Sequence, residues 1–243
     1  GTVVAFHAHP DDESLIMGGS LARASREGHR VVLVVATNGD HGQIPDDLAP
    51  GETLMDRRKR ETQASCDVLG IHRLVWLGYC DSGMTGWEQN NLPGAFVAAD
   101  VDEAAQRLAD VLIEERADVV TVYDWHGNYG HPDHIQVHKV GHRAAAIAGT
   151  KNVFETTMNR DHFRMVYEMA KEHAAQLPDG AAPDDFNPDG PADDGNPMGE
   201  PASVISHRVD VREYLDFKRQ AIACHASQVT DSSFLGNMSP EIF

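Results

Sequence analysis

Short apolar runs alternate with longer amphipathic stretches along most of the chain. The apolar runs are rich in β-branched residues and bounded by turn residues, a pattern typical of buried strands. They occupy residues 3–6, 31–36, 74–77, 119–123 and 153–156. The amphipathic stretches predict helices at residues 15–26, 54–69, 101–115, 132–148, 161–176 and 211–224. Gly28, Gly70 and Gly149 follow three of them, and glycine accepts the left-handed backbone that ends a helix.

This alternation predicts the fold class. Strands separated by helices form a parallel sheet that is covered by helices on both faces. We therefore expect an α/β fold, with a Rossmann-like open sheet that is mostly parallel. The length of 243 residues fits a single domain spanning residues 1–243. Residues 178–201 are rich in Pro, Gly and Asp. Because this composition buries little apolar surface, the segment is predicted to be an acidic surface loop.

The net charge of the chain, together with its apolar runs and its cysteines, predicts which partners it lacks and where in the cell it works. The chain has 20 Lys and Arg against 38 Asp and Glu, a formal net charge of −18. Nucleic acids and anionic membranes attract basic surfaces, so neither is expected as a partner. No apolar run approaches the ~18 residues of a membrane span, and the first residues lack the basic start of a signal peptide. With three widely spaced cysteines, Cys66, Cys80 and Cys224, these features predict a cytoplasmic protein.

A first polar motif follows the first predicted strand directly. Residues 9–13 read His-Pro-Asp-Asp-Glu, and loops at the carboxyl ends of parallel strands form the ligand crevice of an open α/β sheet. Neighbouring carboxylates point in different directions, so one of Asp11 and Asp12 could bind a metal together with His9. Acidic residues are also typical of a helix N-terminus, where the helix dipole favours negative charge. This motif alone leaves both interpretations open.

A second motif, residues 131–134 (His-Pro-Asp-His), follows the fourth predicted strand and opens a helix. We expect it at the same edge of the sheet as His9. Histidine nitrogen and carboxylate oxygen are ordinary zinc ligands, and catalytic zinc usually has three protein ligands and a water. The two motifs together therefore predict a catalytic metal site. Alternatively, His134 and His138 could bind one metal from a single helix face. His142, one turn further on, is interpreted as a packing or surface residue.

Further short motifs accompany these two. They are residues 8–14, Arg58 with Glu61, residues 69–70, residues 81–84 (Asp-Ser-Gly-Met), residues 129–134, Lys218 and residues 225–228. Together they resemble the PIG-L/LmbE-like zinc-dependent N-acetylglucosaminyl deacetylases. The resemblance covers roughly residues 3–157 and 204–229, and residues 178–201 have no counterpart in it. The Asp-Ser-Gly-Met motif is most similar to the actinobacterial branch that acts in mycothiol metabolism.

The resemblance implies a role for each residue of the two main motifs. It implies that His9, Asp12 and His134 are the zinc ligands and that Asp11 is the general base. His131 would lie at the oxyanion or assist the leaving group. By the same resemblance, the residues that line the substrate pocket are Arg58, Asp81 and Tyr129.

The function implied is that of a metal-dependent hydrolase. It would remove the acetyl group from an N-acetylated aminosugar conjugate, a small molecule, by means of a zinc-activated water. One alternative is an amidase of a larger glucosaminyl-linked thiol conjugate, but that pattern has a lysine where residues 15–19 read Leu-Ile-Met-Gly-Gly. Another is a non-catalytic metal-dependent sugar-binding module. Two histidines and one carboxylate also suit Fe²⁺. The sequence predicts no oligomeric state.

Overall fold

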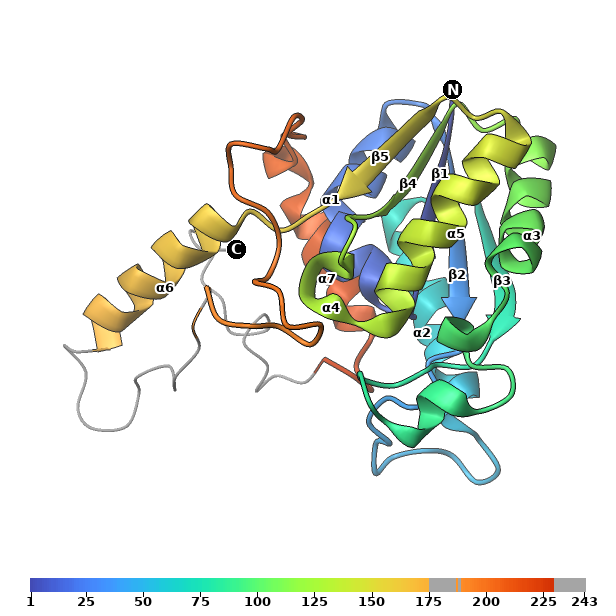
Figure 1. Ribbon diagram of the computed structural model, residues 1–243, viewed down its shortest axis with the longest axis horizontal. Coiled ribbons are helices and arrows are strands. Elements are labelled where there is room, and N and C mark those ends of the chain that lie inside the picture. The colour runs from blue at the N-terminus through green and yellow to red at the C-terminus, as the bar shows by residue number, and fades with distance from the viewer. Residues whose placement is uncertain (175–186, 188, 230–243) are drawn as a thin grey trace.

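The computed structural model describes residues 1–174, 187 and 189–229, and its centre is an open sheet (Figure 1). The strands are β1 (Thr2–His7), β2 (Arg30–Thr37), β3 (Arg73–Tyr79), β4 (Val119–Tyr123) and β5 (Asn152–Thr156). Their order in the sheet is β3-β2-β1-β4-β5, and every neighbouring pair is parallel. The predicted α/β class and Rossmann-like sheet are confirmed. The sheet was predicted to be mostly parallel, and across the described residues it is entirely so.

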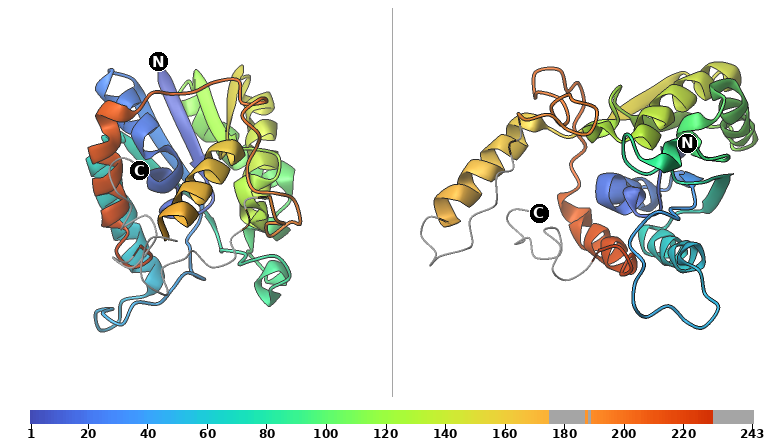
Figure 2. Two further views of the ribbon diagram at one scale, coloured as in Figure 1. Left: turned by 90° about the vertical axis from the view of Figure 1, so that its left-hand side faces the viewer. Right: turned by 60° about the horizontal axis from the view of Figure 1, so that its bottom comes forward.

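Helices cover both faces of the sheet, as predicted. They are α1 (Asp12–Arg26), α2 (Leu54–Leu69), α3 (Val101–Glu114), α4 (Gly127–Gly130), α5 (Pro132–Ala148), α6 (Arg160–Ala174) and α7 (Leu215–Cys224), with 3₁₀ turns η1 (Glu88–Asn91), η2 (Phe96–Ala98) and η3 (Arg212–Tyr214). Successive strand side chains face opposite ways: Leu33 of β2 packs with α1, α2 and α7, and Val34 packs with α3 and α5. The left view of Figure 2 shows these two helix layers with the sheet between them.

The observed helix ends match the glycine signals closely. Gly70 and Gly149 end α2 and α5 with φ of 75° and 74°, in the left-handed region that glycine accepts at low cost. The first helix begins earlier than predicted, at Asp12, because the Asp11 carbonyl accepts backbone N–H groups of the first turn. Residues 175–176 of the sixth predicted helix lie outside the described residues. No helix in the described ranges is long and apolar enough to cross a membrane.

The order of the strands determines where the two histidine motifs lie. Residues 9–13 follow β1, and residues 131–134 follow β4 after the short helix α4. These two strands are neighbours, and the connections from them lead to opposite sides of the sheet, toward β2 and toward β5. Such a switch point opens a crevice at the carboxyl edge. The motifs were expected at one edge, and the topology brings them to adjacent strands there.

The acidic segment predicted as a surface loop is only partly described. Residues 178–186 and 188 lie outside the described residues. Further along, Asp193 donates its backbone N–H to the Tyr129 carbonyl (3.0 Å), and Gly199 donates to the Asn128 carbonyl (2.7 Å). The Asp193 carboxylate also accepts the backbone N–H of Thr85 (2.9 Å). The end of this segment therefore packs against the loop that precedes the second motif. The single-domain organisation stays a prediction.

Candidate metal centre

Three side chains of the two motifs converge at the carboxyl edge of the sheet. His9 lies in the loop after β1, Asp12 is the first residue of α1, and His134 lies in the first turn of α5. His9 Nδ1 is 3.3 Å from His134 Nε2. Asp12 Oδ2 is 3.5 Å from His9 Nδ1 and 3.4 Å from His134 Nε2. The three atoms thus form a nearly equilateral triangle among buried side chains.

The size of this triangle fits a divalent ion. Tetrahedral zinc with bonds of about 2.0–2.1 Å keeps neighbouring ligand atoms about 3.3–3.4 Å apart, and its protein ligands are of these types. The separations of 3.3–3.5 Å match that edge length. Two imidazole nitrogens and one carboxylate oxygen would leave a fourth position for solvent or substrate, as in catalytic sites. The chemistry and spacing of the donor set therefore suit a catalytic metal.

A second layer of side chains orients these ligands. His9 Nε2 lies 3.2 Å from Asp133 Oδ2, which also accepts the backbone N–H of Ser82 (2.9 Å). Tyr123 donates its hydroxyl to Asp12 Oδ2 (2.8 Å) and stacks its ring on His134, with centroids 4.2 Å apart. Such partners fix the tautomer and direction of metal ligands. The sequence analysis missed both residues: Asp133 lies within the second motif, and Tyr123 ends the strand before it.

The contact between Asp133 and His9 makes a prediction about metal affinity. In Asp133→Asn, an amide group replaces a carboxylate that accepts hydrogen bonds at both oxygens, so the His9 ring loses part of its orientation. We expect metal affinity to fall by about 10–100-fold, as measured by competition with a chelator of known affinity. Ser82→Ala is the control, because it removes a neighbour of the same carboxylate and keeps the contact with His9. Equal affinities in Asp133→Asn and the unchanged protein would refute this role.

Asp11 is held beside the three ligands in a strained backbone conformation. Its φ is 109°, a value that costs free energy for a residue with a side chain. Its backbone N–H donates to Glu13 Oε2 (3.0 Å), and Arg58 Nη2 donates to its Oδ2 (3.0 Å). Burial raises the pKa of Asp11 to about 7, although the Arg58 guanidinium lowers it. The carboxylate can therefore take up a proton near neutral pH.

A buried network from the C-terminal part of the chain holds Glu13 in turn. Glu13 Oε1 accepts the Ser65 hydroxyl of α2 (2.5 Å) and lies 2.7 Å from Nε2 of His225, the residue after α7. Burial lowers the pKa of His225, but the charge and hydrogen bond of Glu13, together with the charges of Asp11 and Glu61, raise that pKa above its usual value. Residues 225–228 carried part of the family resemblance without an assigned role. The structure connects them to the backbone of Asp11.

His131 faces the same centre as a neutral donor. Its Nδ1 accepts the backbone N–H of Asp133 (3.1 Å), so the proton of the neutral ring resides on Nε2. Its ring centroid is 4.6 Å from that of His9 and 5.2 Å from that of His134. Burial, together with the charges of His9 and His134, lowers the pKa of His131 to about 3. The arrangement suits hydrogen-bond donation to an oxygen.

The three predicted substrate contacts differ in their surroundings. Asp81 Oδ1 lies 3.6 Å from His9 Nε2, and the Tyr129 hydroxyl lies 3.5 Å from His134 Nε2. Both residues therefore line the centre. Arg58 is 3% exposed, and it donates to Asp11 and to the carbonyls of Pro10 and Gly39. Its contact with a sugar stays a prediction, whereas its contact with Asp11 is direct.

The alternative pair His134 and His138 is separated in this structure. His134 faces His9 and Asp12, as described above. His138 Nδ1 lies 3.0 Å from the Tyr123 carbonyl and 3.6 Å from Glu155 Oε1. The two histidines of α5 therefore have different partners.

Fold and site together define a class of protein. A Rossmann-like parallel sheet has at its switch point two histidines and a carboxylate arranged for a metal, with a further carboxylate beside them. This is the construction of a metal-dependent hydrolase.

Comparison with known proteins identifies the family. The model of the PIG-L family, described as GlcNAc-PI de-N-acetylase, matches residues 4–145. The chain therefore belongs to the PIG-L family and is a hydrolase of the deacetylase type, so the resemblance found in the sequence is confirmed.

Relatives of known function match over most of the chain. The chain is similar to the 1D-myo-inositol 2-acetamido-2-deoxy-α-D-glucopyranoside deacetylase of Nocardiopsis dassonvillei, with 40% identity over 92% of this chain and 83% of the relative. The enzyme of that name from Thermobifida fusca is 38% identical over 93% of this chain and 83% of its own length.

Solved structures share the fold at lower identity. The N,N'-diacetylchitobiose deacetylase of Pyrococcus horikoshii has a TM-score of 0.62 and 22% identity, over 99% of this chain and 75% of that one. The conserved protein TT1542 of Thermus thermophilus has a TM-score of 0.61 and 22% identity, over 96% and 82%.

Proposed function

We propose that this chain removes the acetyl group from a glucosaminyl-inositol conjugate, with Zn²⁺ held by His9, Asp12 and His134. The observation that carries the substrate is the 40% identity, over 92% of this chain, to a deacetylase named for the N-acetylglucosaminyl-inositol compound. The ligand triangle of 3.3–3.5 Å supports the metal. Zinc is favoured over Fe²⁺ because the separations match tetrahedral zinc.

Amide hydrolysis is slow because water is a weak nucleophile and because the tetrahedral oxyanion that forms is high in free energy. A divalent ion at these ligands supplies a Lewis acid that polarises the acetyl carbonyl and lowers the pKa of water. Asp11 takes the proton from the attacking water, since its carboxylate lies beside the ligands and burial raises its pKa from that of an ordinary carboxyl toward that of a general base. His131 donates its Nε2 proton in a hydrogen bond to the developing oxyanion.

The second half of the reaction breaks the C–N bond. The new bond joins the water oxygen to the acetyl carbon, and the leaving nitrogen departs with the electron pair of the old bond. The proton that Asp11 removed passes to this nitrogen, so the products are acetate and a free amine. Asp11 then returns to its ionised form. His131 keeps its Nε2 proton throughout. Its Nδ1 accepts the backbone N–H of Asp133, so the ring cannot take up a second proton there and act as an acid.

The surroundings of the centre support a small aminosugar as the substrate. Asp81 lies beside His9 and Tyr129 lies beside His134, and we propose that they bind sugar hydroxyl groups. The net charge of −18 favours a cationic amine product over a polyanion. The three cysteines are all free, which supports the proposal of a cytoplasmic enzyme. The acidic net charge supports the proposal that it has no nucleic-acid or membrane partner.

The experiment that tests this function is turnover by the zinc-loaded protein. The N-acetylglucosaminyl-inositol compound and an amide-linked glucosaminyl thiol conjugate would be supplied separately, and free amine would be measured. We expect faster release from the acetylated compound. Preference for the thiol conjugate would favour the amidase alternative. Tight sugar binding without release of amine would favour the non-catalytic module.

The pairing of Arg58 with Asp11 predicts the acidic limb of the pH profile. Asp11 acts as a base only when ionised, so kcat/KM should fall as the pH drops below the pKa of Asp11, which burial raises and which the Arg58 guanidinium and a bound divalent ion lower. The guanidinium favours the ionised form, so Arg58→Gln should raise the pKa of Asp11 and move the limb upward by roughly one pH unit. Arg58→Lys keeps the charge and should move it less. A uniform loss of rate with the limb unmoved would indicate a purely structural role for Arg58.

A further inference from the structure

A second cluster of metal-binding side chains lies further along α5, beginning one turn beyond the catalytic ligand His134 on the same helix face. His138 and His142 are one turn apart on this helix, and Glu155 comes from the neighbouring strand β5. Their side chains are 22%, 43% and 40% exposed. The mechanism proposed above uses none of them. In the sequence analysis His142 was interpreted as a packing or surface residue.

The geometry of this cluster resembles a binding site more than an isolated surface ion pair. His142 Nε2 lies 2.8 Å from Glu155 Oε1. The His138 ring adjoins the same oxygen, with its Nδ1 at 3.6 Å, and Nε2 is the nitrogen of this ring that would bind the ion. One ligand atom from each residue lies within 4.8 Å of the others, and the two histidine rings are 4.6 Å apart. Histidines at positions i and i+4 of a helix present both rings to one ion.

A backbone hydrogen bond prepares His138 for this role. Its Nδ1 lies 3.0 Å from the carbonyl oxygen of Tyr123, and only a protonated nitrogen can donate to a carbonyl. In the neutral ring the lone pair therefore resides on Nε2, the usual arrangement for a ligating histidine. Tyr123 is thus shared, because its carbonyl faces this cluster and its hydroxyl faces Asp12.

We propose that His138, His142 and Glu155 form a second site for a divalent transition metal, weaker than the catalytic one. Two imidazoles and a carboxylate select Zn²⁺, Co²⁺, Ni²⁺ or Cu²⁺ over Mg²⁺ and Ca²⁺, which prefer oxygen ligands. The exposure of the three side chains makes it the weaker site, since solvent competes for each ligand.

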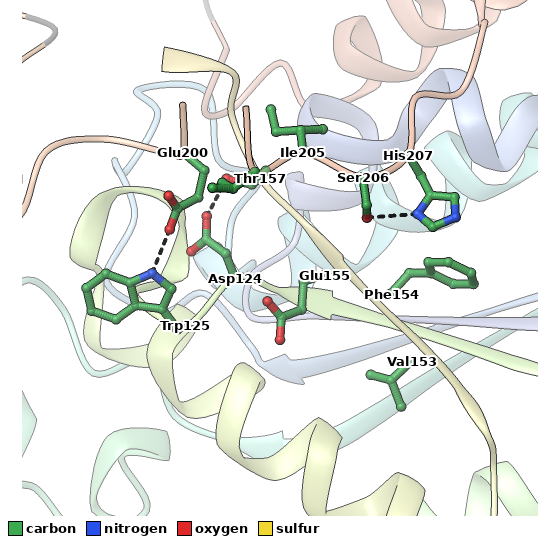
Figure 3. Close-up of a pocket in the computed structure, with 11 residues that line it drawn as sticks. Asp124, Trp125, Val153, Phe154, Glu155, Thr157, Glu200, Ile205, Ser206 and His207 are labelled. Carbon is green, nitrogen blue, oxygen red and sulfur yellow. Dashed lines mark hydrogen bonds between the residues drawn. The ribbon is translucent and has the colours of Figure 1, made fainter. Parts of the chain in front are cut away.

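The surface next to Glu155 is hollowed. Glu155 also lines a hollow of about 410 Å³, together with Phe154, Ser206 and His207 (Figure 3). None of the predicted catalytic residues lines this hollow. His138 and His142 do not line it either, so Glu155 is the one residue of the proposed site that borders the hollow.

The test is a titration of the metal-free full chain with Co²⁺, followed by its visible absorption and by the bound metal after dialysis. We expect each chain to bind about two Co²⁺ ions. The more weakly bound ion should have two histidine ligands. His142→Ala should bind only about one equivalent, and Glu155→Gln should weaken the second one. His162→Ala is the matched control, an exposed histidine of α6 outside the cluster, and it should keep both.

Two results would overturn the proposal. One is a single equivalent bound by the unchanged protein at millimolar metal, and the other is a second equivalent that persists in His142→Ala. Thermal unfolding of the metal-free variants shows that they are folded. With one equivalent of zinc, His142→Ala should deacetylate at the unchanged rate, because this residue contacts Glu155 and not the catalytic ligands. Failure of the proposed deacetylation would leave the metal titration unaffected, so the two claims are tested separately.

Discussion

Replacing Asp11 with Asn should lower kcat/KM by about 10²–10⁴-fold while the protein keeps its metal. The amide cannot take a proton from water, and it has no role among the three ligand atoms. Asn is the appropriate substitute for the backbone as well, because it tolerates a positive φ better than most residues, and Asp11 has a φ of 109°. The measurement is single-turnover deacetylation together with metal content.

A matched control separates the loss of the base from a general loss of charge. Asp46→Asn removes an exposed carboxylate from the loop before α2, and it should leave both rate and metal content unchanged. If Asp11→Asn retained most of the activity, Asp11 could not be the base. If it instead lost the metal, its carboxylate would belong to the ligand set.

Replacing His134 with Ala should remove the tightly bound metal and with it all measurable activity. His134 supplies one of three ligand atoms, and at least three protein ligands are usual for catalytic zinc. The buried ring also stacks on Tyr123, so thermal unfolding of the metal-free protein is needed to show that the variant folds. Metal content after dialysis against a chelator is the direct measurement.

His138→Ala is the informative comparison for this variant. Both residues lie on α5, one turn apart, and a metal shared between them would be lost from either variant. In the structure His138 faces Tyr123 and Glu155 instead. We therefore expect the tight metal to remain in His138→Ala, and its loss would restore the alternative pairing of His134 with His138.

Much of the fold could be predicted because its signals are local. The five strands contain short apolar runs bounded by turn residues, and Gly70 and Gly149 mark the ends of helices through their own backbone conformation. The parallel sheet then places the ends of β1 and β4 at one edge. From this the sequence predicted that the two histidine motifs would meet, although 125 positions separate His9 from His134. The choice of His134 as the ligand came from the family resemblance.

The remaining parts of the site depend on contacts between distant residues. Glu13 is an ordinary acidic residue of a helix N-terminus until Ser65 and His225 are seen beside it. Arg58 looks like a surface cation at helical spacing, and only its burial against Asp11 shows otherwise. The spacing of residues within a motif does not predict which distant side chain each residue contacts or from which direction.

Direct observation of the metal tests the central claim most sharply. A crystal of the protein with one equivalent of zinc, measured at the zinc absorption edge, should show one strong anomalous peak. That peak should lie about 2.0–2.2 Å from His9 Nδ1, Asp12 Oδ2 and His134 Nε2. A peak bound elsewhere, with these three atoms uncoordinated, would contradict the account.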